Sequence, residues 1–232
     1  SQPAPTGAAT VVSTVKGDSL SYVSSIVHLP LTGGFATGHG YPGHIRVWTS
    51  EGVLEATLEG HAGVVRALAA RGCGSLVSGS FDCTARVWSG TACVAVLRGH
   101  TDWVIAVAVH PSNDNIVAAG SDDGTVRVWD VASSTCTAVL EGHTLTVCAV
   151  AFLSNGSIVS KSHDDTVRVW SPDGVCKSVL EHPNDVNSLT VLPDDTFIVG
   201  GDGFVRKWAG DVEQWTTHTV GTYVRSVSSV SP

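Results

Sequence analysis

Five tryptophans recur at a nearly constant interval and divide most of the chain into similar units. They are Trp48, Trp88, Trp129, Trp170 and Trp208, with spacings of 40, 41, 41 and 38 residues. Each one ends a short segment of the form apolar-Arg-Val-Trp, with Lys in place of Val in the last unit. A repeat of this length predicts a row of similar structural units, each of which buries its apolar surface against its neighbours.

Between these tryptophans, apolar and polar residues alternate with a period of two. Val-rich runs of this kind cover residues 103–109, 146–152 and 186–192. Residues typical of tight turns bound the runs, such as Asn155-Gly156 and Asp173-Gly174. No segment keeps a helical period, so each unit is predicted to hold four short antiparallel strands, and the predicted fold class is all-β.

Polar residues precede the tryptophans at fixed offsets. An aspartate stands six residues before the tryptophan in four units: Asp82, Asp123, Asp164 and Asp202. A histidine lies further upstream in the same units, after a glycine in the first three of them: His61, His100, His143 and His182. The first unit departs from the pattern, because Pro42 occupies the aspartate offset and Asp18 lies near the histidine position.

Together, the Gly-His pairs, the turn aspartates and the strand-ending tryptophans resemble the WD40-repeat β-propeller family from about Val11 to Val230. The literal Trp-Asp pair stands at Trp129-Asp130. The resemblance implies a WD40-type β-propeller with five clear four-stranded blades, a blade being one sheet of the ring. It also implies that each repeat supplies the outer strand of one blade and the three inner strands of the next.

The same resemblance implies a hydrogen-bonded chain of histidine, strand hydroxyl, aspartate and tryptophan inside each blade. Two units carry complete sets: His61, Ser78, Asp82 and Trp88, then His143, Ser160, Asp164 and Trp170. Two are incomplete: His100, Asp123 and Trp129 with Ala119 at the hydroxyl position, and His182, Asp202 and Trp208 with Ile198 near it and one residue deleted. A metal or catalytic site needs groups that converge on one point, whereas these recur once per blade. We therefore interpret them as structural and predict no metal, no cofactor and no catalytic residue.

Other motifs that suggest chemistry are also better explained by the repeat. Residues 38–43 spell Gly-x-Gly-x-x-Gly, but a strand over residues 45–48 follows, whereas a dinucleotide site needs a helix there. No nucleophile elbow, zinc-protease helix or Walker loop is present, so we do not expect an enzyme. The six cysteines never form Cys-x-x-Cys, and we expect them to be reduced and packed as small apolar groups.

Charge and hydropathy restrict the partners and the location. Lys and Arg number 13 against 21 Asp and Glu, a net charge of −8, and no basic block occurs, which argues against nucleic acid. The longest apolar run, residues 147–153, is too short to insert into a membrane. Residues 1–10 do not resemble a signal peptide, so a cytoplasmic location is expected, with the nucleus as the alternative. We expect residues 1–8 to be a flexible segment and residues 9–232 to form a single domain.

In the resembled family, most ligand contacts come from two loops per blade at the narrower top face. The loop before the first strand gives Tyr22, Val64, Trp103, Thr146, Asp185 and Tyr223, and the loop between the second and third strands gives Tyr41, Phe81, Asp122, His163 and Gly201. We predict a protein-binding site, the top rim, made of Tyr22, Tyr41, Phe81, Trp103, Asp122, His163, Asp185 and Tyr223. Exposed Trp and Tyr are typical of interaction hot spots, and the aspartates favour a basic partner.

The predicted function is a non-catalytic scaffold that binds a peptide or protein domain on this face and belongs to a multiprotein complex. One alternative is ubiquitin binding, because residues 76–88 are similar to propellers of the phospholipase-activating, ubiquitin-binding type. Another is a constitutive structural subunit of a large intracellular complex. Fold analogy supports all three, since one architecture serves many partners.

The ends of the chain bear on how the ring closes. Six blades need about 246 residues at this repeat length, and the chain has 232. Residues 9–16 resemble an outer strand and residues 223–230 a first inner strand. We expect either an incomplete sixth blade formed by both ends or a fragment of a longer, seven-bladed ring.

Overall fold

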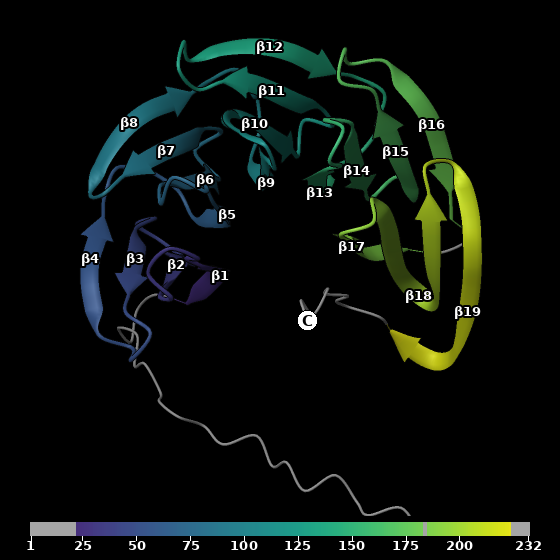
Figure 1. Ribbon diagram of the computed structural model, residues 1–232, viewed down its shortest axis with the longest axis horizontal. Coiled ribbons are helices and arrows are strands. Elements are labelled where there is room, and N and C mark those ends of the chain that lie inside the picture. The colour runs from purple at the N-terminus through teal and green to yellow at the C-terminus, as the bar shows by residue number, and fades with distance from the viewer. Residues whose placement is uncertain (1–21, 183–184, 224–232) are drawn as a thin grey trace, which may run out of the picture.

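The computed structural model describes residues 22–182 and 185–223, and within them every regular element is a β-strand. The strands form five antiparallel sheets that stand side by side around an open ring (Figure 1). No helix occurs in the described part of the chain, and so none that could cross a membrane. The all-β propeller predicted from the repeats is confirmed.

The sheets, numbered here as blades 1 to 5, follow one another along the sequence. Blade 1 holds β1 (Val23–His28), β2 (Phe35–His39), β3 (Ile45–Trp48) and β4 (Leu54–Leu58). Blade 2 holds β5 (Val65–Ala70), β6 (Leu76–Ser80), β7 (Ala85–Ser89) and β8 (Ala92–Leu97). Blade 3 holds β9 (Val104–His110), β10 (Asn113–Ser121), β11 (Val126–Asp130) and β12 (Thr135–Leu140). Blade 4 holds β13 (Val147–Phe152), β14 (Ile158–Ser162), β15 (Thr166–Trp170) and β16 (Cys176–Glu181).

Blade 5 contains β17 (Val186–Val191), β18 (Thr196–Ala209) and β19 (Val212–Tyr223). The first part of β18 pairs with β17, and the part from Asp202 onward pairs with β19. One continuous strand thus corresponds to the second and third strands of the other blades. The two parts meet at Asp202-Gly203, where Gly203 has φ +81°, a conformation that glycine adopts without strain.

The predicted incomplete sixth blade falls on residues 9–16 and 223–230. All of these lie outside the described residues except Tyr223, which ends β19 and pairs with Asp202. The prediction that Tyr223 precedes a new inner strand differs from this placement. β19 continues past the length of the other outer strands and carries Tyr223 with it.

The core lies in the seams between consecutive blades. Between blades 2 and 3, Val87 and Leu97 of blade 2 pack with Trp129 of blade 3, and equivalent clusters fill the other three seams. The repeat tryptophans of blades 2 to 5 therefore pack against the preceding blade, and Trp88, Trp129 and Trp170 are each 1% exposed. The seams explain the period of the sequence, because a sheet with two apolar faces needs a neighbour on both sides.

All six cysteines are free, but three of them do not pack in the core. Cys73, Cys93 and Cys136 are exposed, so the expectation that the cysteines act as small apolar groups is wrong for these three. Cys93 and Cys136 lie on outer strands, where each Sγ accepts a long hydrogen bond of 3.9 Å from the arginine of the neighbouring third strand. These two thiols therefore make polar contacts at the outer edge of their blades instead of packing in the core.

Candidate functional site: internal polar chains and the top rim

Blade 2 joins its four polar residues in one hydrogen-bonded chain. His61 Nε2 and Trp88 Nε1 lie 2.7 and 2.8 Å from Ser78 Oγ. His61 Nδ1 lies 2.7 Å from Asp82 Oδ2. A carboxylate is an acceptor, so Nδ1 carries the proton, and the Ser78 hydroxyl donates to Nε2 and accepts from the indole.

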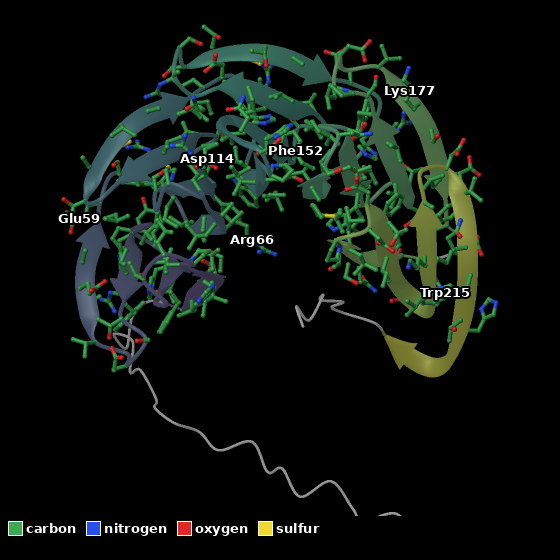
Figure 2. All side chains as sticks on the ribbon, in the orientation of Figure 1. Glu59, Arg66, Asp114, Phe152, Lys177 and Trp215 are labelled. Atoms are coloured by element: carbon green, nitrogen blue, oxygen red, sulfur yellow. The ribbon has the colours of Figure 1, made fainter. Side chains whose placement is uncertain are left out.

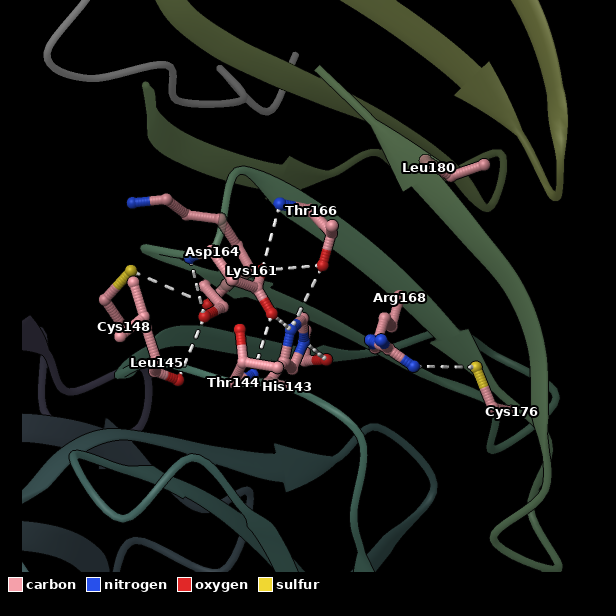
Figure 3. Close-up of polar contacts among 12 residues, drawn as sticks. His143, Thr144, Leu145, Cys148, Lys161, Asp164, Thr166, Arg168, Cys176 and Leu180 are labelled. Carbon is pink, nitrogen blue, oxygen red and sulfur yellow. Dashed lines mark hydrogen bonds and ion pairs between the residues drawn. The ribbon is translucent and has the colours of Figure 1, made fainter. Parts of the chain in front are cut away.

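Blade 4 repeats this geometry. Ser160 Oγ lies 2.8 Å from both His143 Nε2 and Trp170 Nε1. His143 Nδ1 lies 2.9 Å from Asp164 Oδ2, and Figure 3 shows these two side chains facing each other. Burial raises the pKa of the Asp164 carboxyl, but hydrogen bonds from Thr166 and His143 outweigh burial and hold that pKa below its ordinary value. Burial also lowers the pKa of His143.

A threonine that the sequence analysis did not identify belongs to the polar chain in each of blades 2, 3 and 4. Thr84, Thr125 and Thr166 each donate Oγ1–H to the Oδ1 atom of the aspartate two residues before them, at 2.6 to 2.7 Å. The sequence does contain a signal for this threonine, because the motif Asp-x-Thr occurs in three consecutive repeats. The threonine fixes the carboxylate so that its other oxygen faces the histidine.

Blade 3 lacks the hydroxyl and uses the backbone in its place. His100 Nδ1 lies 2.8 Å from Asp123 Oδ2, as in the neighbouring blades. His100 Nε2 lies 3.2 Å from the carbonyl oxygen of Ala119, the residue at the hydroxyl position. The Trp129 ring remains in contact with the His100 ring, edge to face at 5.5 Å. The histidine, aspartate and tryptophan thus keep their places without the serine.

The structure does not join the predicted set of blade 5. His182 Nδ1 contacts the carbonyl oxygen of Leu180 at 3.0 Å, and Nε2 has no hydrogen-bond partner among the described residues. Trp208 Nε1 is also buried without a partner in the described part of the chain. The strand register places Val199, rather than Ile198, at the position equivalent to Ser160. A valine offers no acceptor to either ring.

The deleted residue of blade 5 explains why Asp202 is displaced from the histidine. The turn that contains Asp202 is one residue shorter than the turn that contains Asp164. The Asp202 N–H donates to the carbonyl oxygen of Asp185, the bond that His163 makes to Thr146 in blade 4. Asp202 therefore takes the place of a rim residue, and its carboxylate accepts a 2.6 Å hydrogen bond from Asn187 Nδ2.

Blade 1 builds its own version from residues of one hairpin. Thr37 Oγ1 accepts a 2.8 Å hydrogen bond from Trp48 Nε1 and lies 2.9 Å from His39 Nε2. The His39 ring stacks on the His44 ring at 4.6 Å. Asp18, predicted to stand near the histidine position, lies outside the described residues. His39 Nε2 thus contacts the strand hydroxyl of blade 1 in the way that His61 Nε2 contacts Ser78 in blade 2.

These polar chains lie inside the blades. The side chain of His61 is 0% exposed, and those of His100 and His143 are 1% exposed. In the described part of the chain, no three His, Cys, Asp or Glu side chains gather as metal ligands. The arrangement holds the turns of blades 2 to 4 in place, and its histidines are covered from solvent.

One backbone hydrogen bond per blade ties the two predicted rim loops together. The residue that begins the second loop donates its N–H to the carbonyl of the residue before the first strand, at 2.9 to 3.0 Å: Gly40 to Tyr22, Phe81 to Val64, Asp122 to Trp103, His163 to Thr146 and Asp202 to Asp185. Both loops therefore lie at the same end of every blade. In blades 1 and 5 the bonded residues are Gly40 and Asp202, each one position away from the predicted Tyr41 and Gly201.

Two rim aromatics from consecutive blades form a pair. Phe81 of blade 2 and Trp103 of blade 3 stack with ring centroids 4.1 Å apart and an interplanar angle of 7°. Trp103 is nevertheless 45% exposed. Asp102 is exposed beside it, and Asp122 accepts a hydrogen bond from the Thr146 hydroxyl. The pair forms a flat apolar surface with acidic groups around it.

The remaining rim residues are dispersed along the arc of blades. Tyr22 and Tyr41 of blade 1 are exposed and lie apart from the stacked pair in the sequence of blades. His163 and Asp185 line a hollow of about 270 Å³ at the seam between blades 4 and 5, together with Asp165 and Asn187. Of Tyr223 the described structure gives the backbone position alone, at the end of β19.

Comparison with known proteins gives the same repeats. The family model for the WD domain, G-beta repeat, matches residues 52–89, 91–130, 134–171 and 174–209. The chain is 35% identical over 123 residues to a probable coatomer subunit beta' of Schizosaccharomyces pombe, covering 50% of this chain and 16% of that protein. It is 30% identical over 124 residues to DDB1- and CUL4-associated factor 13 of Dictyostelium discoideum, covering 50% and 28%.

A third relative is the ribosome biogenesis protein WDR12 homolog of Trichoplax adhaerens, which is 33% identical over 135 residues, or 52% of this chain and 31% of the relative. The chain thus spans less than a third of the length of these curated relatives. The four matched repeats cover more than half of the chain, and each runs from the outer strand of one blade through the inner strands of the next. The chain belongs to the WD domain, G-beta repeat family.

Proposed function

We propose that this propeller is a non-catalytic scaffold that binds a protein partner through the top rim. The stacked pair of Phe81 and Trp103 carries the proposal. A tryptophan that is 45% exposed yet stacked on a ring from the preceding blade loses little entropy when a partner covers it. Relatives named as a coatomer subunit and a CUL4-associated factor support a role in protein assemblies.

The charges around the pair define the chemistry of the partner. Asp102 and Asp122 lie beside the pair, Asp185 belongs to the same rim at blade 5, and the chain carries a net charge of −8. A segment with Lys or Arg beside an apolar residue fits this surface, because its cation gains from both the carboxylates and the aromatic faces. Binding is expected to weaken as salt is raised.

The test is affinity capture from a cell lysate with the wild type and with the double variant Phe81→Ala, Trp103→Ala. Trp215 provides the matched control, because it is 44% exposed but lies on the outer strand of blade 5 (Figure 2). We expect the double variant to lose about tenfold or more of the partner signal while Trp215→Ala retains it. Equal capture by the double variant at an unchanged melting temperature contradicts the proposal.

A second role, as a constitutive subunit of a large complex, is favoured by the relatives that are named as a coatomer subunit and a ribosome biogenesis protein. Such a subunit buries its blade edges and lower face as well as the top rim. Size-exclusion chromatography of the protein from lysate separates the two proposals. A constitutive subunit elutes with the complex, whereas a transient scaffold is largely found at the size of the free chain.

Three finer predictions rest on the sequence alone. Ubiquitin binding rests on sequence similarity at residues 76–88, and titration of the labelled domain with ubiquitin by NMR tests it. The cytoplasmic location, with the nucleus as alternative, is tested by imaging a tagged protein in its native cell. The absence of nucleic-acid binding likewise stays a prediction, argued from the acidic net charge.

A further inference from the structure

The seams between consecutive blades also open on the lower face, which is the face opposite to the top rim. The turns that join the first strand to the second and the third strand to the fourth lie there, because the rim loops occupy the other end of every blade. A hollow of about 240 Å³ occurs at this end of the seam between blades 3 and 4. We call it the lower hollow.

The lower ends of the other three seams are closed. Between blades 2 and 3, Asp114 (Figure 2) accepts hydrogen bonds of 2.8 and 3.1 Å from two backbone N–H groups of blade 2. Between blades 4 and 5, Asp195 accepts a 2.7 Å hydrogen bond from the Ser154 N–H. Between blades 1 and 2, Leu31 lies against Gly74, and the space left there is about 30 Å³.

Gly156 explains why the seam between blades 3 and 4 stays open. Strand pairing places Gly156 of blade 4 at the position of Asp195 in blade 5, and both have a positive φ, +83° and +61°. A glycine has no side chain that could reach the preceding blade as Asp195 does. Among the described residues, no hydrogen bond crosses the lower end of this seam, and the contact there is between the rings of His110 and Phe152, 5.2 Å apart.

The lower hollow is apolar at its base and polar at its mouth. Leu140, Phe152 and Ile158 line the base, are 2 to 9% exposed and belong to the core of the seam. Thr137 and Asn155 line the mouth and are exposed. Water that touches such a base forms few hydrogen bonds, so an apolar group that replaces this water is favoured.

His110 supplies an unused hydrogen-bond donor beside the hollow. Its Nδ1 accepts a 3.2 Å hydrogen bond from the Ser112 N–H, so the proton of the neutral ring is on Nε2. Nε2 makes no hydrogen bond to a described residue and lies next to Gly156, where a Cβ atom would be 3.0 Å away. A carbonyl oxygen is an acceptor that fits such a donor without bringing a charge into the hollow.

We propose that the lower hollow binds one apolar side chain of a protein partner, whose adjacent backbone carbonyl accepts a hydrogen bond from His110 Nε2. Sites for drug-sized molecules enclose about 300–1,000 Å³, so a hollow of about 240 Å³ suits a single side chain better than a whole cofactor. No charged side chain is among the described lining residues, which disfavours an ionic ligand. The site is independent of the proposed function, since Phe81 and Trp103 lie on the opposite face.

Methyl NMR tests the proposal, because two of the six isoleucines, Ile116 and Ile158, line the lower hollow. The chain is labelled with 13C at the isoleucine δ1 methyl groups, and the two signals are assigned with Ile116→Val and Ile158→Val. The probe is N-acetyl-leucine methylamide, and N-acetyl-glycine methylamide is the matched control. We expect the leucine probe alone to shift both signals in a saturable manner, while Ile45 of blade 1 does not respond. Equal responses to the two probes, or an equal response of Ile45, overturn the proposal.

A variant that fills the hollow locates the binding. Ala138→Leu adds three carbons to the lining from β12, and Ala56→Leu is the matched control, because Ala56 pairs with Val47 as Ala138 pairs with Val128. We expect Ala138→Leu to weaken binding of the leucine probe about tenfold or more, while Ala56→Leu binds as the wild type does. Unchanged affinity of Ala138→Leu contradicts the proposed site.

A second variant tests the hydrogen bond and leaves the base of the hollow intact, so it also serves if Ala138→Leu does not fold. His110→Phe keeps a ring against Phe152 and removes the N–H donor. We expect it to weaken binding of the leucine probe about threefold to tenfold at an unchanged melting temperature. Affinity equal to that of the wild type refutes the role of His110, and the proposal as stated fails.

Discussion

Blade 5 is expected to make the protein sensitive to mild acid through His182. The ring is 7% exposed, stacks on Phe204 at 5.4 Å and has one unsatisfied nitrogen among the described residues. Burial, and secondarily the charge of Arg206, lower the pKa of His182 from 6.5 to about 4. As the pH falls below 6.5, His182 becomes protonated in the unfolded chain, whereas in the folded chain it becomes protonated near pH 4.

The sign and size of the effect follow from this difference. Because the folded pKa lies below the unfolded value, stability falls as the pH is lowered from 6.5 to 4 and falls no further through this group. At pH 5 the loss is about 2 kcal/mol, or roughly 4–8 °C in melting temperature for a chain of this size. His143, whose pKa burial also lowers, adds a loss of the same sign. The aspartates of blades 2 to 4 keep their contribution in this window, since their lowered pKa values lie beneath it.

The assay compares thermal melts of the wild type and His182→Phe at pH 7 and pH 5. Phenylalanine keeps the stacking on Phe204 and cannot titrate, so we expect the wild type to lose about 2 kcal/mol more than the variant over this interval. Hydrogen exchange at pH 5 should show the loss first in β17, β18 and β19. If both proteins lose the same stability between the two pH values, the assignment of the acid sensitivity to His182 is refuted.

Three further changes test the packing and the polar chains, each by urea unfolding. Ser160→Ala leaves the Trp170 indole N–H and His143 Nε2 without a partner and should cost about 2–4 kcal/mol; a cost below about 1 kcal/mol contradicts this hydrogen-bonded arrangement. Gly120→Ala brings a Cβ within 2.6 Å of Val147 and should cost about 1–3 kcal/mol; unchanged stability contradicts the close packing of this seam. Val199→Ser should be about 1–2 kcal/mol more stable than Val199→Ala, because the hydroxyl gives Trp208 Nε1 the acceptor it lacks. Equal stability of these two variants argues against that placement.

Much of the fold was predictable because the information is local and repeated. The alternation of period two, the turn pairs and the Trp spacing specify strands of known length and order, and the structure has them. Where a repeat has every residue of the polar set, as blade 2 does, the offsets from Trp88 also locate the hydrogen-bond partners His61, Ser78 and Asp82. A constant offset works as long as the turn between two strands keeps its length.

Blade 5 shows where that reasoning stops. The constant offset from Trp208 predicted that Asp202 contacts His182. The shortened turn instead places Asp202 at the rim, beside Asn187. In blade 1, the histidine comes from within the hairpin, at His39, and no offset from the tryptophan in the other repeats points to it. Both outcomes depend on strand register, which a count along the sequence does not contain.

The sequence by itself determined an all-β ring of similar blades, the family to which it belongs and the internal polar chains of blades 2 to 4, because each of these follows from residues at fixed spacing. Tertiary structure decided which residues from different blades meet. Phe81 and Trp103 are 22 positions apart and stack because two loops of consecutive blades emerge at the same edge. Lys161 stands where the other four blades have glycine, and only the pairing of the strands aligns these five residues, because the turns between them differ in length.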